Sequence, residues 1–331
     1  MRLPVHRAER SRISFPAWLL GAARVHPACR VGRSTKERNL TSNSRAGRPQ
    51  PPFDGKAALI YGAAKGIGRA VALEFARRGA RLGIADIDKA GADETAALII
   101  AAGGQAIGLR CDVTSELSVR EAAVAAEVAL GEIDIVMNNV GGILNGNPED
   151  IPVAEWERIL SLNLMSAVRG NAVFLPKMIA RGNGHIVNTA SFAGLYPFAA
   201  SRVPYVAAKA AVVAMSESLA LYLHPKGIRV SCLCPGPVMT GVMDSMKTWS
   251  ANTVLRGPGS HLEIKTVDQV ATTLADGMRD GRIIIPTDES VWETLRQHAA
   301  SPDAFIQQKI EAFEAGDDGR PRLRTPVPVQ E

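Results

Sequence analysis

From residue 53 onward, short apolar runs alternate with longer stretches of helical periodicity. Ala57–Tyr61, for example, is an apolar run bounded by Asp54-Gly55 and Gly62, which is typical of a strand buried on both faces. Glycine and proline punctuate the pattern and mark turns between the elements. We therefore expect further strands at residues 81–85, 106–110, 133–137, 185–190 and 281–286, and helices at 69–79, 90–102, 115–130, 153–181, 206–223, 291–299 and 304–313.

Strands and helices that alternate in this way predict an α/β domain with a doubly wound parallel sheet. The pattern continues without a second core-forming region, so we expect a single domain over residues 53–290. The two helices predicted after it form a C-terminal extension over 291–313, while residues 314–331 are polar and rich in proline, which predicts a disordered tail.

The first predicted strand leads into a glycine-rich turn, Gly62-x-x-Lys65-Gly66-Ile67-Gly68, which opens a helical pattern. Strand, glycine turn and helix in this order are the context that a dinucleotide-binding fingerprint requires. Glycines allow the backbone to approach a pyrophosphate, and the helix N-terminus supplies N–H groups. The sequence thus predicts a Rossmann-type dinucleotide site at this turn.

Asp86 closes the second predicted strand, where an acidic side chain can bind both hydroxyls of the adenosine ribose. A carboxylate there also repels a 2′-phosphate, so it favours NAD over NADP. Lys65 is a cation that favours NADP instead, which keeps that cofactor open as the alternative. Asp86 is also well placed to cap the following helix, and the two roles are compatible.

A second group of chemically active residues lies at Ser191 and Tyr205-x-x-x-Lys209. Residues four apart share one face of a helix, and an ammonium beside a phenol lowers the phenol pKa from roughly 10. A tyrosine with a lowered pKa can donate or accept a proton in catalysis. Ser191 follows the apolar run 185–190, so its hydroxyl is expected at the carboxyl end of a strand, where ligands bind in parallel sheets. The Tyr-Lys spacing alone occurs often by chance and gains weight only from its surroundings.

The net charge of +5 is distributed unevenly along the 331 residues. Residues 1–50 hold ten Arg and one Lys against Glu9 and Glu37, a net of +9, which leaves −4 for the rest. The basic character therefore belongs to the leader, and we expect no nucleic acid as a partner. Arg, Ser, Pro and Ala dominate residues 1–52, a composition that fits a transit peptide, an export signal, or a disordered extension from a misplaced start.

The remaining sequence offers no metal site and no expected membrane partner. Four cysteines are present, and Cys232-x-Cys234 lies in a predicted strand without the spacing of a zinc site, so buried free thiols are expected. Thiols of this kind favour a cytoplasmic location, with import into an organelle as the alternative if the leader is real. We expect no segment after residue 50 to cross a membrane.

Over about residues 54–290, the sequence resembles the short-chain dehydrogenase/reductase family. The glycine turn, Asn138-Asn139-Val140-Gly141 and the Pro235-Gly236 loop appear in the family's order, although Tyr61 and Val140 depart from its usual Thr and Ala. The resemblance implies a catalytic set of Asn163, Ser191, Tyr205 and Lys209, with Tyr205 as general acid/base. It also implies these cofactor contacts: Gly62, Lys65, Gly66, Ile67, Gly68, Asp86, Cys111, Asp112, Val113, Asn139, Val140, Gly141, Tyr205, Lys209, Pro235, Gly236, Val238 and Thr240.

The resemblance makes residues 238–260 the variable substrate loop, and the residues around it are apolar. No cluster of positive charge faces this region, since Lys247 and Arg256 are isolated in the sequence. We therefore expect a bulky, apolar, uncharged secondary alcohol or ketone as substrate. The residues expected to contact it are Ser191, Phe192, Tyr196, Tyr205, Met239, Met243 and Trp249.

Together these features predict an NAD-dependent alcohol dehydrogenase or ketone reductase. The alternatives are a non-catalytic dinucleotide-binding regulator, an NADP-dependent carbonyl reductase, and a lyase or epimerase that uses its nucleotide internally. The helix over 206–223 is apolar nearly all round, and with the helix over 153–181 it resembles the pair that forms the family's dimer interface. We therefore expect a homodimer or homotetramer.

Overall fold

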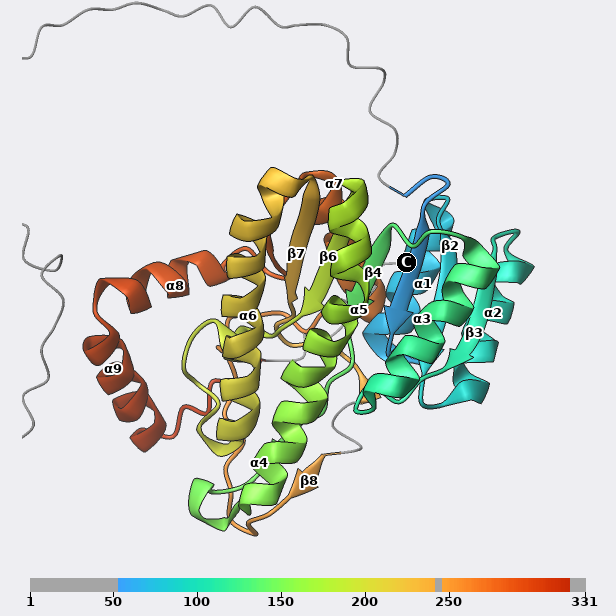
Figure 1. Cartoon of the computed structure of the whole chain (residues 1–331). Coiled ribbons are helices and arrows are strands. Elements are labelled where there is room, and N and C mark those ends of the chain that lie inside the picture. Colours follow the sequence, from blue (N-terminus) through green and yellow to red (C-terminus); the bar gives the residue numbers. More distant parts are fainter. Residues whose placement is uncertain (1–52, 242–245, 322–331) are drawn as a thin grey trace, which may run out of the picture. The chain divides into compact units, whose positions relative to one another are not determined.

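A sheet of seven parallel strands forms the centre of the fold in the computed structural model, which describes residues 53–241 and 246–321 (Figure 1). The strand order is β3-β2-β1-β4-β6-β7-β9, and every pair is parallel. The prediction of a doubly wound parallel sheet is confirmed. The strands are β1 (Ala57–Tyr61), β2 (Arg81–Asp86), β3 (Ala106–Arg110), β4 (Ile135–Asn138), β6 (Gly184–Thr189), β7 (Ile228–Cys234) and β9 (Ile284–Pro286).

Helices cover both faces of this sheet, which is why its central strands are apolar without alternation. In β1, Ala58 and Ile60 pack on one side with α1, α2 and α7, while Leu59 and Tyr61 pack on the other with α3, α5 and α6. All five residues of β1 are buried. The helices are α1 (Gly66–Arg77), α2 (Lys89–Ala101), α3 (Glu116–Leu130), α5 (Ser166–Arg181), α6 (Val203–Leu223) and α7 (Val267–Arg279).

Two predicted strands begin later than expected. The strand predicted at 133–137 begins at Ile135, because the Asp134 carboxylate binds the side chain of Lys56 at 2.9 Å and the amide of Ala57 at 3.0 Å. The strand predicted at 281–286 begins at Ile284, because Gly281, with φ of 72°, and Arg282 complete the turn after α7.

The helix predicted over 153–181 is interrupted. It consists of α4 (Val153–Leu160), a π-helical turn (Ser161–Met165) and α5. Within the widened turn, the Asn163 side chain donates to the carbonyl oxygens of Ile159, at 3.0 Å, and Gly142, at 2.9 Å. Such a turn places a polar side chain where a regular helix would not, and π turns occur often at functional sites.

Several smaller elements surround the sheet. A two-stranded sheet joins β5 (Leu144–Asn145) to β8 (Lys247–Thr248), so part of the expected substrate loop is held as a strand. The C-terminal extension forms α8 (Val291–Ala300) and α9 (Pro302–Glu314), and α8 leads away from α6 to α9 in the view of Figure 1. Short 3-10 turns occupy Pro148–Asp150, Phe192–Gly194, Ala200–Arg202 and His224–Lys226.

The prediction of a disordered tail from residue 314 differs from the structure over residues 314–321. Glu314 ends α9, and the chain then turns back so that Asp318 and Gly319 accept backbone hydrogen bonds from Gly257 and Gly259. The sequence pattern could not show this contact because its two sides are far apart in the chain. The predicted leader and residues 322–331 lie outside the described residues.

One helix of the described residues, together with its flanking turns, is long and apolar enough to span a membrane by length and composition alone. It covers Ala200–Lys226 and is built around α6, which carries Tyr205 and Lys209. α6 packs against β7 and buries residues such as Val212 and Ser216. Because core helices of soluble proteins pass the same test, this finding does not by itself indicate a membrane.

Candidate active site

The glycine turn after β1 brings two backbone segments into contact. A Cβ on Gly68 would lie 1.9 Å from the carbonyl oxygen of Gly62, so only glycine fits there. Gly62 and Gly66 have φ angles of 78° and 59°, the left-handed region that favours glycine. The Asn139 amide donates to the Gly62 carbonyl oxygen at 3.0 Å and fixes the turn from the side of β4. The result is a bare backbone cradle at the N-terminus of α1.

Asp86 lies beside this cradle at the end of β2. One carboxylate oxygen accepts the amide of Ala64, in the glycine turn, at 3.0 Å, and the other accepts the amide of Asp88 at 3.0 Å. The role as helix N-cap falls to Asp88, whose side chain accepts the Gly91 amide at 3.0 Å. Asp86 therefore braces the turn and keeps lone pairs for a further donor.

The other predicted cofactor contacts follow the neighbouring strands. Cys111 and Val113 are buried, and the Asp112 carboxylate accepts both the amide and the hydroxyl of Thr114. Those bonds lower the Asp112 pKa, the Thr114 hydroxyl most of all. Beyond β4, Val140 contacts Gly62 so closely that a Cβ on that glycine would lie 2.8 Å from the Val140 methyl. These segments all lie at the carboxyl edge, around the point between β1 and β4 where the strand order reverses.

The cradle, Asp86 and the carboxyl edge fit a dinucleotide. A pyrophosphate requires backbone that approaches without side chains, which Gly62, Gly66 and Gly68 provide. A ribose requires an acceptor at the end of the second strand, which Asp86 provides. The described residues hold no cluster of three or more side chains suited to a metal ion.

Ser191, Tyr205 and Lys209 converge at the same edge. Ser191 follows β6, and the backbone bond from Phe192 to the Pro235 carbonyl ties it to the end of β7. Tyr205 and Lys209 come from the first two turns of α6. The Lys209 ammonium donates to the Thr189 carbonyl at 2.8 Å and lies 5.7 Å from the centre of the Tyr205 ring.

Asn163 reaches the same place from the π-helical turn. A Cβ on Gly141 would lie 2.7 Å from the side-chain oxygen of Asn163 and 3.2 Å from the Lys209 ammonium nitrogen. The Asn163 and Lys209 side chains therefore both lie next to Gly141. Asn163 is buried, and its amide and carbonyl groups are held by the backbone of Gly142. All four residues expected to be catalytic are thus neighbours in space.

Burial dominates the electrostatics of this group. The pKa of Tyr205 is raised rather than lowered as the sequence predicted, because removal from water outweighs the Ser191 hydroxyl and the charge of Arg202, which oppose the rise. Burial also lowers the pKa of Lys209 to about 8. Arg202 is a contributor that the sequence reasoning missed; a basic residue three positions before Tyr205 was the available signal.

The loop after β7 packs onto the serine segment. A Cβ on Gly236 would lie 2.7 Å from the Phe192 ring, and the Gly236 amide donates to Thr287 at 2.8 Å. Val238 pairs with Lys265, and Pro235 is buried. Thr287 is a further residue that the sequence reasoning missed, since it lies beyond β9 and its pattern is that of an ordinary turn.

The residues expected to contact substrate fall into two groups. Phe192 and Tyr196 are only 1% and 4% exposed and belong to an aromatic cluster under the site. Met239 and Trp249, in contrast, are 64% and 37% exposed on the loop. Met243 lies outside the described residues. The first pair is therefore buried next to Ser191, and the second pair is exposed on the loop.

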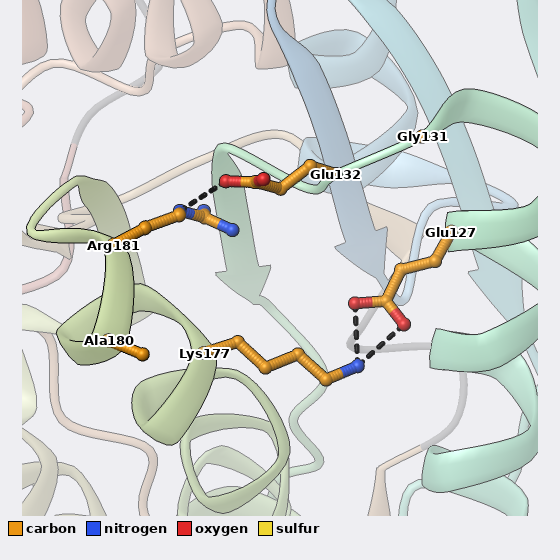
Figure 2. A pocket seen from close by; sticks show the side chains of 6 residues that line it. All are labelled: Glu127, Gly131, Glu132, Lys177, Ala180 and Arg181. Carbon is orange, nitrogen blue, oxygen red and sulfur yellow. Dashed lines mark hydrogen bonds and ion pairs between the residues drawn. The ribbon is translucent and has the colours of Figure 1, made fainter.

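Two surface depressions differ in their place relative to this edge. One, of about 510 Å³, lies between α3 and α5, where Lys177 pairs with Glu127 at 2.6 Å and Arg181 pairs with Glu132 at 2.7 Å (Figure 2). Gly131 lines it at the end of α3, which leads to the amino end of β4. The other, of about 530 Å³, lies at the carboxyl edge, where it is lined by Thr114, by residues of α4 and by Ser161 and Leu162 of the π-helical turn. The depression between α3 and α5 takes no part in the catalytic chemistry, because its charged side chains are paired with one another and it lies at the amino end of β4, away from the glycine turn.

Comparison with known proteins gives concordant matches. Residues 56–251 match the family described as short chain dehydrogenase. A Mycobacterium bovis protein named "Probable oxidoreductase EphD" is 34% identical over 243 residues, which are 73% of this chain and 40% of that protein. The aligned part thus spans well under half of that relative.

Two solved structures are also similar. A short chain dehydrogenase/reductase from Burkholderia phymatum in complex with NAD is 30% identical, with a TM-score of 0.65, over 82% of this chain and 99% of that chain. A 7α-hydroxysteroid dehydrogenase complexed with NADH and 7-oxo glycochenodeoxycholic acid is 29% identical, with a TM-score of 0.63, over 72% and 94%.

Proposed function

The chain belongs to the short chain dehydrogenase family, and on that premise we propose that it is an NAD-dependent oxidoreductase that interconverts a secondary alcohol and a ketone. The observation that carries this proposal is the convergence of Ser191, Tyr205 and Lys209 beside the glycine cradle. A proton donor and a dinucleotide cradle at one sheet edge are the two parts that such a reaction requires.

Tyr205 is the proton carrier in this proposal. Its phenol would protonate the carbonyl oxygen during reduction and take the proton back during oxidation. The Ser191 hydroxyl, next to the phenol, orients the same oxygen. Bound NAD(H) supplies or accepts the hydride at the substrate carbon.

Lys209 and Asn163 hold this arrangement in place. The Lys209 ammonium is fixed by the Thr189 carbonyl, which places its charge beside the ring of Tyr205. Below its pKa of about 8, Lys209 keeps that charge and stabilises the phenolate as the proton leaves. The Asn163 side chain accepts the Gly142 amide and lies close to Lys209. In this proposal it offers a polar group through which a proton can reach the lysine.

Asp86 supports NAD rather than NADP. Its carboxylate would accept the ribose hydroxyls and repel a 2′-phosphate. Of the cations near it, Arg69 makes a two-bond pair with Glu94 at 2.9 and 3.1 Å, and Lys89 pairs with Asp93 at 2.6 Å. Lys65 has no ion-pair partner among the described residues and is exposed, so it carries the case for an NADP-dependent carbonyl reductase.

A bulky, apolar and uncharged substrate is consistent with the surroundings of the site. Phe192, Tyr196 and Phe198 form a packed aromatic floor, with ring centres 6.2 and 5.3 Å apart in that order. Met239 and Trp249 add exposed apolar surface above it. A similar protein, the 7α-hydroxysteroid dehydrogenase, is complexed with a 7-oxo compound and NADH, which supports a ring ketone as the substrate class.

α6 also supports assembly into a homodimer or homotetramer. It is apolar nearly all round, and Leu221 and Tyr222 are 82% and 61% exposed in the single chain. Exposed apolar side chains on a core helix indicate a surface that a second copy can cover. We place the assembled enzyme in the cytoplasm, in keeping with its free thiols at Cys111, Cys232 and Cys234.

Turnover across a panel of alcohols and ketones tests this function. The absorbance of the reduced cofactor should change with at least one ring ketone or alcohol and should depend on Tyr205. Tight NAD binding without turnover of any panel compound would favour a non-catalytic regulator.

A further inference from the structure

Residues 256–259 lie near the end of the substrate loop, and we call them the loop end. They contact residues that neighbour Ser191 and Tyr205 in the sequence. The Arg202 guanidinium, at the start of α6, donates to the Arg256 carbonyl. The Tyr196 hydroxyl donates to the Pro258 carbonyl at 3.0 Å. Arg202 comes three residues before Tyr205, and Tyr196 belongs to the aromatic floor. The loop end is therefore hydrogen-bonded both to the residue before the helix of Tyr205 and to the aromatic floor.

The other side of the loop end is joined to the C-terminal segment, residues 302–320. The Arg256 guanidinium lies 4.2 Å from the centre of the Phe313 ring, a close cation–π contact. Its side chain also donates to the Asp317 carbonyl at 3.3 Å. The amides of Gly257 and Gly259 donate to the carbonyls of Asp318 and Gly319 at 2.7 and 2.9 Å.

The backbone contact between these two segments depends on glycine on both sides. A Cβ on Gly257 would lie 2.3 Å from the Gly319 carbonyl oxygen. Gly319 has a φ of 63°, and a Cβ on it would lie 2.8 Å from the Gly257 carbonyl oxygen. Both glycines thus allow an approach that any side chain would prevent. Gly257 and Gly259 are buried although they lie in a loop.

α9 reaches the site by a second route through aromatic rings. Phe305 is 5% exposed, and its ring centre lies 6.4 Å from that of Tyr196 with the two rings nearly perpendicular. Tyr196 in turn lies 6.2 Å from Phe192, the residue that follows Ser191. The C-terminal segment therefore touches the loop end and the floor of the site, although neither contact is needed to complete the sheet.

We propose that the C-terminal segment is a brace that fixes the position of the loop end and so limits the size of the substrate that the site accepts. The proposal rests on the proposed function, because it assigns a specificity role at the same site. Phe313, Gly257 and Gly319 are positioning residues in it, since they act through the loop end. A segment that served only stability would leave the substrate preference unchanged when its contacts weaken.

The first test needs no substrate. Hydrogen exchange of residues 253–262 is compared between the full chain, Phe313→Ala, Gly257→Ala and the control Gln307→Ala, which changes an exposed side chain of the same helix. Exchange in this segment should rise at least ~3-fold in Phe313→Ala, as expected for a lost cation–π contact. It should also rise in Gly257→Ala, because the new Cβ would lie 2.3 Å from the Gly319 carbonyl oxygen. It should stay unchanged in Gln307→Ala. Unchanged exchange in Phe313→Ala and Gly257→Ala would overturn the brace.

The second test measures size selectivity with uncharged ketones of one, two and four rings and NADH. In Phe313→Ala, the ratio of kcat/KM between the best and the poorest ketone should fall at least ~3-fold, while the KM for NADH stays the same. Phe313→Tyr keeps the ring face and should restore the ratio. A loosened loop end with an unchanged ratio would overturn the specificity role. If the full chain itself turns over no ketone, the proposed function fails, and the exchange test still decides on the brace.

Discussion

Replacement of Asp86 by Asn should relax the choice of cofactor. Both oxygens of the carboxylate are already in use, one by the Ala64 amide and one by the Asp88 amide, each at 3.0 Å. Asn keeps one oxygen as an acceptor, so the glycine turn loses less support than it would with Ala. What Asn removes is the negative charge, which strengthens bonds to the ribose of NAD and repels the phosphate of NADP.

The magnitude follows from the bonds that are weakened. A hydrogen bond to a charged group contributes about 1.5–3 kcal/mol, and 1.4 kcal/mol is a factor of ten. The full chain should therefore prefer NAD by at least ~10-fold in kcat/KM, and Asp86→Asn should reduce this preference by a similar factor, mainly through weaker NAD binding.

Steady-state kinetics with both cofactors measures this ratio, and fluorescence titration of NADH and NADPH measures binding alone. Glu94→Gln is the matched control, because it releases Arg69 from its two-bond pair without touching the carboxylate of Asp86. It should improve NADPH binding and leave NADH binding unchanged. A native preference for NADP, or an NAD/NADP ratio of kcat/KM that Asp86→Asn leaves unaltered, would refute the reasoning. Either result would indicate that Lys65 determines the cofactor preference.

Three further predictions address catalysis, stability and assembly. Tyr205→Phe should lower kcat by at least ~10²-fold while NADH still binds, as expected when a general acid is removed; near-normal turnover would contradict its role. Lys209 has a folded pKa of about 8, below its unfolded value, so the folded protein binds fewer protons between pH 8 and 10.5 and its stability rises with pH across that window. Relative to Lys209→Met, the cofactor-free protein should gain on the order of 3 kcal/mol in unfolding free energy between pH 8 and 10.5, measured by urea denaturation; a flat difference would show that Lys209 keeps its charge when buried. Light scattering should give the mass of a dimer or tetramer, because α6 exposes Leu221 and Tyr222 in the single chain; an active monomer at micromolar concentration would refute the predicted interface.

The sequence was informative where one local pattern determines the structure. β1 has the predicted bounds, because an uninterrupted apolar run between turns specifies a buried strand. β3 also has the predicted bounds, although only Leu109 of its residues is buried. The glycine turn was also recognisable from a local pattern: glycine is required at position 68 because a Cβ there would lie 1.9 Å from the carbonyl oxygen of Gly62, six residues earlier. Ser191 could be placed at the ligand-binding edge because the carboxyl ends of parallel strands share one edge. Asn163 was joined to Ser191, Tyr205 and Lys209 only by the resemblance to the family.

Features that depend on distant contacts could not be predicted. The π-helical turn at Ser161–Met165 keeps the apolar periodicity of a helix, and only its contact with Gly142 reveals it. The segment after α9 has the composition of a disordered tail, but Gly319 packs on Gly257. No sequence pattern singled out Arg202, and its position beside the phenol follows from the turn that precedes α6.

Transfer of a labelled hydride tests the central claim most directly. The chain is incubated with a ring ketone that it accepts and NADH that carries deuterium at both hydrogen positions of the nicotinamide C4, and the alcohol is analysed by mass spectrometry. The account predicts deuterium at the carbinol carbon with the full chain, and loss of this product at equal NADH occupancy in Tyr205→Phe. An unlabelled alcohol, or a labelled one formed equally well by Tyr205→Phe, would contradict it.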